Sequence, residues 1–174
     1  LKPAKQFHLF NSIYQALFET APDHRQTKPR TKLTDKLSEQ FPLCILVVED
    51  DLINQKLILR ILKKMGYEAR LATNGLEALQ HVDQHQVDLI LMDVQMPQMD
   101  GLEATKQIRL KTKNKAISYS PIIVAMTANA MPEDRQYCLD AGMNDYISKP
   151  VDVKKLEAIF KHWAPQSEQS QPTD

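Results

Sequence analysis

The chain has few cysteines, no excess of either charge and no long apolar run. Its 174 residues include two cysteines, and 22 basic residues balance 22 acidic ones. Cys44 and Cys138 lie far apart in element-like segments, which favours a reducing compartment and packing roles over a disulfide. A formal net charge of zero argues against a nucleic-acid surface. No run approaches the roughly 20 apolar residues of a membrane helix, and the N-terminal residues lack a signal-peptide pattern.

The overall composition, 43% hydrophobic and 25% charged, is typical of a soluble globular protein. From residue 43 onward, short apolar runs alternate with segments of helical periodicity. The pattern predicts strands at 43–48, 67–73, 87–92, 121–127 and 144–148, and helices at 52–65, 75–84, 101–111, 132–142 and 151–163. Asn74 and Glu77 have the spacing of a capping box. The alternation predicts an α/β fold, a (βα)5 doubly wound parallel sheet with helices on both faces.

Acidic side chains end two of the predicted strands. Asp93 closes an apolar run within LILMDVQMPQMDG, and Glu49 and Asp50 follow the run LCILVV. Thr127 and Lys149 come at the ends of the fourth and fifth predicted strands. Ligands of doubly wound sheets bind at the carboxyl ends of the strands, so we expect these five residues at one edge of the sheet.

Carboxylates gathered at one site repel one another unless a cation lies between them. Mg²⁺ prefers oxygen ligands and commonly joins one or two carboxylates to phosphate. The Thr127 hydroxyl and the compact charge of Lys149 suit the stabilisation of a transferring phosphoryl group. No Cys, Ser or His is placed as an activated nucleophile at this edge. The carboxylate of Asp93 is therefore the candidate nucleophile, and an aspartyl phosphate is the expected product.

Each of these residues also has a purely structural interpretation. Asp93 could form an Asx turn before its loop, and Glu49 and Asp50 could cap the helix that follows, although Asp51 is better placed for that role. Tyr146 could be an ordinary core aromatic. The five histidines show no metal-ligand spacing with cysteines or acids, and no kinase dimerisation motif surrounds them.

Four motifs carry a resemblance to a known family. LCILVVEDD, LILMDVQMPQMDG, VAMTANA and NDYISKP occur in order over residues 41–164 and resemble response-regulator receiver domains of two-component signalling. The segments EDDLINQK, AMTANAM and ISKP are most similar to receivers at the C-terminal end of hybrid sensor histidine kinases. The resemblance implies a flavodoxin-like strand order 2-1-3-4-5.

The same resemblance implies a role for each acid. Asp93 would accept a phosphoryl group from a phosphohistidine. Asp50 would bind Mg²⁺ or Mn²⁺ directly, Glu49 would do so largely through water, and Asp93 with the backbone carbonyl of Gln95 would complete the protein ligands. One departure is Asp51, where receivers of hybrid kinases usually have Asn.

It also implies roles for the groups around the phosphoryl site. Thr127 and Lys149 would each contact a phosphoryl oxygen, and the proline after Lys149 would follow a cis peptide bond. Tyr146 would be the switch aromatic that moves inward with Thr127. Gln95 and Asn129 would set the lifetime of the aspartyl phosphate. The loop 112–120 is a few residues long for the family.

Residue 1 is Leu rather than Met, so we expect a piece of a longer protein. Aligning Lys2-Pro3 with Lys149-Pro150 superposes two apolar helical stripes, which suggests that the chain starts in the last loop and helix of a preceding receiver-like domain. An ordinary N-terminal amphipathic helix is the alternative. The predicted organisation is a remnant of that domain at 1–19, a linker at 20–41, the receiver at 42–164 and a disordered tail at 165–174.

The expected function is that of a phosphorelay receiver within a hybrid sensor histidine kinase. Its partner would be the phosphohistidine domain of a kinase or phosphotransfer protein, with no nucleic acid and no membrane contact by this fragment. A homodimer could form through the N-terminal helix or through the face made by 132–142, 144–148 and 151–163. The location would be cytoplasmic, whether or not the parent is anchored in a membrane. The isolated domain would turn over nothing except its own phosphoryl group, whereas the parent would be a histidine kinase.

Two other classes remain open. A receiver-like interaction module that works without phosphate would have no use for intact Asp93, Thr127 and Lys149. A phosphatase with an aspartyl-phosphate intermediate would carry a DxD nucleophile after its first strand and a substrate cap, whereas this chain has EDD there and no cap insertion.

Overall fold

The computed structural model describes residues 37–128 and 132–164. Parallel strands form a five-stranded sheet in the order β2-β1-β3-β4-β5. The strands are β1 (Ile45–Val48), β2 (Arg70–Ala72), β3 (Leu89–Asp93), β4 (Ile122–Thr127) and β5 (Asp145–Ser148). This arrangement confirms the predicted doubly wound sheet and its strand order.

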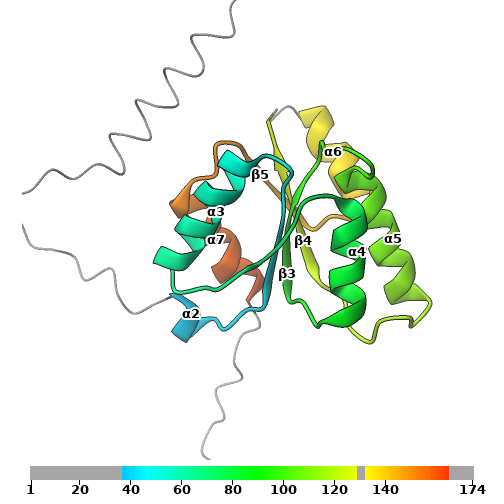
Figure 1. Ribbon diagram of the computed structural model, residues 1–174, viewed down its shortest axis with the longest axis horizontal. Helices are drawn as coiled ribbons and strands as arrows, with labels where there is room; N and C mark the ends of the chain where they lie inside the picture. Colours follow the sequence, from blue (N-terminus) through cyan, green and yellow to red (C-terminus); the bar gives the residue numbers. More distant parts are fainter. Residues whose placement is uncertain (1–36, 129–131, 165–174) are drawn as a thin grey trace, which may run out of the picture. The chain divides into compact units, whose positions relative to one another are not determined.

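Helices cover both faces of this sheet. They are α2 (Leu37–Gln40), α3 (Leu52–Lys64), α4 (Gly75–Gln84), α5 (Gly101–Lys113), α6 (Pro132–Asp140) and α7 (Val153–Trp163). Figure 1 shows α3 and α7 on one face and α4, α5 and α6 on the other. A separate apolar cluster fills the space beneath each group of helices. Within the described ranges, no helix combines the length and apolar character that crossing a bilayer would require.

The central strands are apolar at nearly every position because both of their faces are covered. Every residue of β1 and of β3 is buried, including Asp93 at the end of β3. The two strands pair directly, with Val48 opposite Met92. Such continuous apolar runs are typical of strands buried on both faces, and they bring Asp93 to the rim of the sheet without a change of direction.

Short polar side chains cap the starts of several helices. Asn74 accepts a hydrogen bond from the Glu77 N–H at 2.9 Å, which confirms its role as the N-cap of α4. Glu77 reaches back to the N–H of Thr73 at 2.7 Å, one residue before the cap. Asp100 caps α5 and Asp152 caps α7. Each cap satisfies backbone donors that a helix leaves unpaired at its start.

Every predicted strand and helix is present, but most of their bounds differ from the prediction by one to three residues, and the second strand shows the largest shift. The second strand begins at Arg70 rather than residue 67, because Gly66 has a φ of 95° and Tyr67 turns into the core. The Tyr67 hydroxyl donates to the carbonyl of Phe41 at 2.7 Å, and its ring packs edge-on against Phe160. The helix α2 lies inside the predicted linker 20–41, and Leu37 packs against the core.

The long loop before β4 is tied to the rest of the fold. Helix α5 extends to Lys113, two residues beyond its predicted end, and Ile117 in the following loop is buried. The Tyr119 hydroxyl lies 2.7 Å from the carbonyl of Val82 and 2.6 Å from that of His85. The predictions for 1–19 and for the tail at 165–174 lie outside the described residues.

Candidate functional site

Four of the five strands carry the site at their ends. They are β1, β3, β4 and β5, and they end at the same edge of the sheet because all of them run parallel. Glu49 follows β1, Asp93 is the last residue of β3, Thr127 is the last of β4, and Lys149 follows β5. Asp50 comes one residue after Glu49. The structure therefore brings the predicted residues to one rim, as the position of ligands in doubly wound sheets requires.

Three carboxylates meet at this rim. Glu49, Asp50 and Asp93 each offer an oxygen, and these three atoms lie within 4.8 Å of one another. Glu49 is 0% exposed and Asp93 5% exposed, whereas Asp50 faces solvent. A set of oxygen ligands this close together fits a hard divalent cation, which would also offset the repulsion between the acids.

Lys149 lies between the two buried acids. Its Nζ is 2.7 Å from Asp93 Oδ2 and 2.7 Å from Glu49 Oε2. Burial lowers the pKa of Lys149, but the hydrogen bonds and charges of Asp93 and Glu49 outweigh burial and raise it. The lysine therefore stays protonated in its partly buried position and supplies a fixed positive charge beside Asp93. The Lys149–Pro150 peptide bond is cis.

Glu49 is the most deeply buried of the three acids. Its Oε1 accepts hydrogen bonds from Asn54 Nδ2 at 3.1 Å and from the Asp51 N–H at 3.4 Å. Its Oε2 is buried and pairs with Lys149 Nζ at 2.7 Å. Burial raises the pKa of Glu49, and the Asp93 charge adds to this, while hydrogen bonds from Lys149 and Asn54 oppose it. A buried carboxylate held beside two others again fits a cation site.

The loop after Asp93 folds back over the end of β3. The Gln95 N–H donates to Asp93 Oδ1 at 3.2 Å, and the Gly101 N–H donates to the Val94 carbonyl at 3.0 Å. A Cβ added at Gly101 would lie 2.0 Å from the Asp93 carbonyl oxygen, which leaves no room for a side chain. Glycine at the start of α5 therefore allows the helix to press directly on the backbone of Asp93.

Asp93, Thr127 and Lys149 line a pocket of about 320 Å³ that extends towards α6. Its far wall includes Tyr137 and Cys138. Burial raises the pKa of the Cys138 thiol, and the Asp134 charge adds to this. The sequence predicts only a packing role for Cys138, because its distance in sequence from Asp93 gives no local signal of a place near the site.

Other predicted residues have the following places. Asp51 caps α3, accepting from the N–H groups of Ile53 and Asn54 at 2.9 Å, so its charge is directed at the helix N-terminus. Tyr146 is half-buried, and the guanidinium carbon of Arg135 lies 5.5 Å from the centre of its ring. Asn129 lies outside the described residues. The switch role of Tyr146 and the lifetime roles of Gln95 and Asn129 stay predictions.

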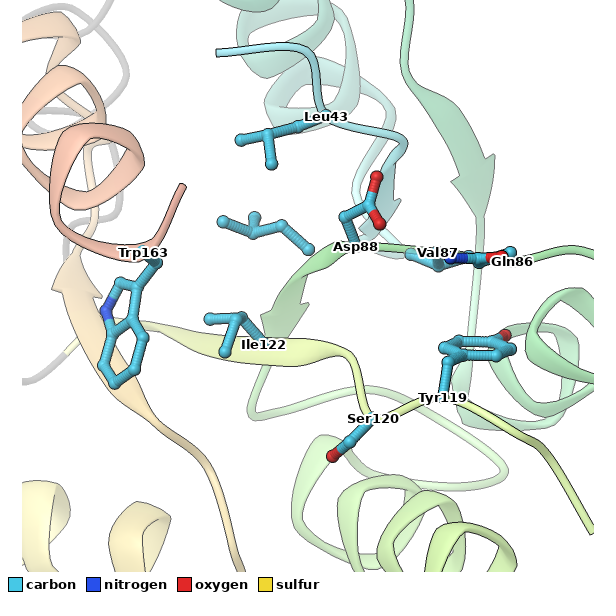
Figure 2. A pocket seen from close by; sticks show the side chains of 9 residues that line it. Leu43, Gln86, Val87, Asp88, Tyr119, Ser120, Ile122 and Trp163 are labelled. Carbon is cyan, nitrogen blue, oxygen red and sulfur yellow. The ribbon is translucent and has the colours of Figure 1, made fainter. Parts of the chain in front are cut away.

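A second pocket, of about 280 Å³, lies at the other end of β3 (Figure 2). Trp163, Leu43 and Ile122 form its apolar wall in the view of Figure 2. Its carboxylate, Asp88, is engaged structurally, because Oδ2 accepts the Cys44 N–H at 2.7 Å. The chemistry expected from the sequence thus belongs to the rim at the end of β3 that carries Asp93.

The fold and the rim together define a doubly wound α/β domain with a buried acid, a neighbouring lysine and a carboxylate cluster. The family model of the response regulator receiver domain matches residues 45–161. The chain belongs to the response regulator receiver domain family, which confirms the resemblance found in the motifs.

Two curated relatives have the names of histidine kinases. The chain is 44% identical over 127 residues to hybrid signal transduction histidine kinase B of Dictyostelium discoideum, a match covering 68% of this chain and 6% of that protein. It is 42% identical over 130 residues to histidine protein kinase 1 of Candida albicans, covering 71% of this chain and 5% of that protein. The chain therefore spans a small fraction of the length of these relatives.

Two solved structures of receiver domains are also similar to this chain. One contains the Saccharomyces cerevisiae phosphotransfer protein Ypd1 with the receiver domain of Ssk1, at 38% identity and a TM-score of 0.66, covering 71% of this chain and 90% of that one. The other is the receiver domain of sensor histidine kinase PA1611 of Pseudomonas aeruginosa, with a magnesium ion in its active-site cleft. It is 39% identical with a TM-score of 0.61, covering 70% of this chain and 96% of that one.

Proposed function

We propose that this chain is the receiver of a phosphorelay and accepts a phosphoryl group from a phosphohistidine onto Asp93. The observation that carries the proposal is the pairing of a buried Asp93 with Lys149 at 2.7 Å, beside the acidic cluster it forms with Glu49 and Asp50. This set supplies a nucleophile, a fixed positive charge and oxygen ligands at one rim.

The reaction needs little from the protein beyond position and charge. A carboxylate oxygen of Asp93 forms a bond to phosphorus while the bond from phosphorus to the imidazole nitrogen of the donor breaks, and the electron pair returns to the imidazole. Lys149 holds its charge beside Asp93 and faces the oxygens of the transferring group. Thr127 lines the same pocket and offers a hydroxyl to one of these oxygens.

A divalent cation, Mg²⁺ or Mn²⁺, would be held by Asp50, Asp93 and the backbone carbonyl of Gln95, with Glu49 acting through water. When bound, it supplies positive charge against the carboxylates and the phosphoryl oxygens. The proximity of the three acids supports this assignment, as does the magnesium ion named in the related PA1611 receiver.

The parent protein would be a hybrid sensor histidine kinase, in line with its curated relatives. The donor would be a phosphohistidine domain, and the related complex of Ypd1 with a receiver supports a phosphotransfer protein as a partner. Signalling would follow from a population shift of the surface made by α6, β5 and α7, through Thr127 and Tyr146.

The test is the intact mass of the chain after incubation with an acyl phosphate, with and without Mg²⁺, beside Asp93→Asn. We expect one phosphate adduct that requires Mg²⁺ and is missing in Asp93→Asn. A folded chain that binds Mg²⁺ but never gains the adduct would instead be a phosphate-independent interaction module. Sustained release of phosphate from unrelated phosphoesters would point to a phosphatase.

A further inference from the structure

Two side-chain amides on α3 hold the buried acid of the site. Gln55 is 5% exposed, and its Nε2 donates to the backbone carbonyl of Glu49 at 2.7 Å. Asn54 is half-buried, and its Nδ2 donates to Glu49 Oε1 at 3.1 Å. One amide thus holds the main chain of Glu49 and the next holds its carboxylate.

Neither amide is needed to start the helix. The side chain of Asp51 already caps α3 by accepting from the backbone N–H groups of Ile53 and Asn54. The side chains of Asn54 and Gln55 instead point back at Glu49, across the first turn. A buried amide that donates to an acid of the site is best explained by what it does to that acid.

We propose that Asn54 and Gln55 are positioning residues that fix Glu49 for divalent-cation binding, Asn54 through the carboxylate and Gln55 through the backbone. The inference rests on the proposed function, because it concerns the cation expected at the same rim. Each amide nitrogen faces an oxygen of Glu49, so each residue acts on the cation site through Glu49.

The physical reason lies in the freedom of a carboxylate. The terminal torsion of a glutamate is broad and roughly two-fold, so an unheld carboxylate samples many orientations. Two donors at Oε1, from Asn54 and from the Asp51 N–H, limit this rotation and keep Oε2 on the side of Lys149 and Asp93. Groups that orient metal ligands in this way change metal affinity by about 10- to 100-fold when they are removed.

The main variant is Asn54→Leu, which removes the donor while keeping a side chain of similar size. Mg²⁺ alone is titrated by calorimetry, and the rate of phosphoryl uptake from an acyl phosphate is measured over a range of Mg²⁺ concentrations. We expect the half-saturating Mg²⁺ concentration to rise about tenfold in both measurements, with the loss of rate overcome at saturating Mg²⁺. A general loss of structure would lower the rate at every Mg²⁺ concentration.

The matched control is Gln107→Leu. Gln107 Nε2 donates to Glu103 Oε1 at 2.8 Å, the same kind of amide-to-carboxylate bond, but on the exposed surface of α5. We expect the Gln107→Leu variant to bind Mg²⁺ with the same affinity as the unsubstituted chain. Asn54→Ala removes the same donor as Asn54→Leu but leaves a smaller side chain. If one of the two variants fails to fold, Mg²⁺ affinity can still be measured on the other.

A double-substitution cycle identifies the route of the effect. If Asn54 acts through Glu49, then adding Asn54→Leu to Glu49→Gln produces no further loss of Mg²⁺ affinity. An equal loss in both backgrounds would overturn the proposed route, and unchanged affinity in Asn54→Leu and Asn54→Ala would overturn the positioning role. Failure of the unsubstituted chain to bind Mg²⁺ would overturn the proposed function, and this inference with it.

Discussion

Substituting Gly101 by Ala tests the close approach of α5 to the end of β3. The new Cβ would lie 2.0 Å from the carbonyl oxygen of Asp93 and 2.9 Å from Met92 Cγ. A relaxed contact of carbon with a carbonyl oxygen is about 3.3 Å or more, so the helix and the strand must separate by about 1 Å. Because β3 is buried and pairs on both sides, neither element can move freely.

Overpacking of this kind costs about 3 kcal/mol, the upper end of the usual range, because the opposing atom belongs to the backbone. Replacing Gly by Ala returns at most about 1 kcal/mol, the value for a helix interior, because Gly101 is the first residue of α5. This leaves a net loss of at least about 2 kcal/mol in the free energy of unfolding. With an m-value of about 2 kcal/mol per molar urea, the unfolding midpoint falls by about 1 M. Since the displaced atom belongs to Asp93, we also expect slower phosphoryl uptake.

Gly75→Ala is the matched control, because Gly75 is likewise the first residue of its helix and gains the same helix propensity. Its nearest contact would be Met99 Cγ, within a flexible side chain, at 2.6 Å, followed by the Met99 carbonyl oxygen at 2.8 Å, a looser approach than the 2.0 Å at Gly101. We expect Gly75→Ala to lose less than about 1 kcal/mol in the same urea titration. Stability of Gly101→Ala equal to that of the unsubstituted chain, or to that of Gly75→Ala, would refute the reasoning.

Three further substitutions probe the charges and the core. Lys149→Met leaves Glu49 and Asp93 without the Lys149 ammonium, so the free energy of unfolding of the metal-free chain should fall by about 3 kcal/mol. Added Mg²⁺ should restore part of this stability in thermal melts, and equal losses with and without Mg²⁺ would contradict the cation site. Glu49→Gln should stabilise the metal-free chain, because the raised pKa of Glu49 means that its ionised form is disfavoured on folding. This gain should be present at pH 7 and shrink as the pH falls towards the ordinary glutamate pKa, and urea titrations that find no such trend would count against it. Burial raises the pKa of Tyr67 to about 12, so its contribution is present below its ordinary pKa and is lost as the pH rises towards 12. Tyr67→Phe should remove up to about 2 kcal/mol of the stability change between pH 9 and pH 12, while an unchanged alkaline profile would show that Tyr67 is solvated.

The strands and the rim could be predicted from the sequence because each rests on a local pattern. The runs before Glu49 and Asp93 are apolar at every position, as strands covered on both faces require, and the rule for parallel strands then brings their ends together. The N-cap at Asn74 was likewise readable from its spacing to Glu77.

The contacts that refine the rim could not be predicted in this way. Asn54 and Gln55 lie on a helix whose polar positions have many ordinary explanations, and only their hydrogen bonds to Glu49 give them a role. The place of Cys138 in the wall of the pocket depends on how α6 packs on the sheet, which no local pattern encodes. The cap at Asp51, by contrast, could be predicted from its place directly before the helix, and its hydrogen bonds from the Ile53 and Asn54 N–H groups confirm it.

We propose Asp93 as the residue that receives the phosphoryl group, and its chemical modification can be observed directly. The first step is to phosphorylate the chain with a small acyl phosphate in the presence of Mg²⁺. The aspartyl phosphate formed on the protein is then reduced with borohydride, and the modified residue is identified by fragment mass. Reduction converts an aspartyl phosphate to homoserine, so we expect homoserine at position 93 and at no other acid. Homoserine at Asp50 or at another acid, with Asp93 unmodified, would contradict it.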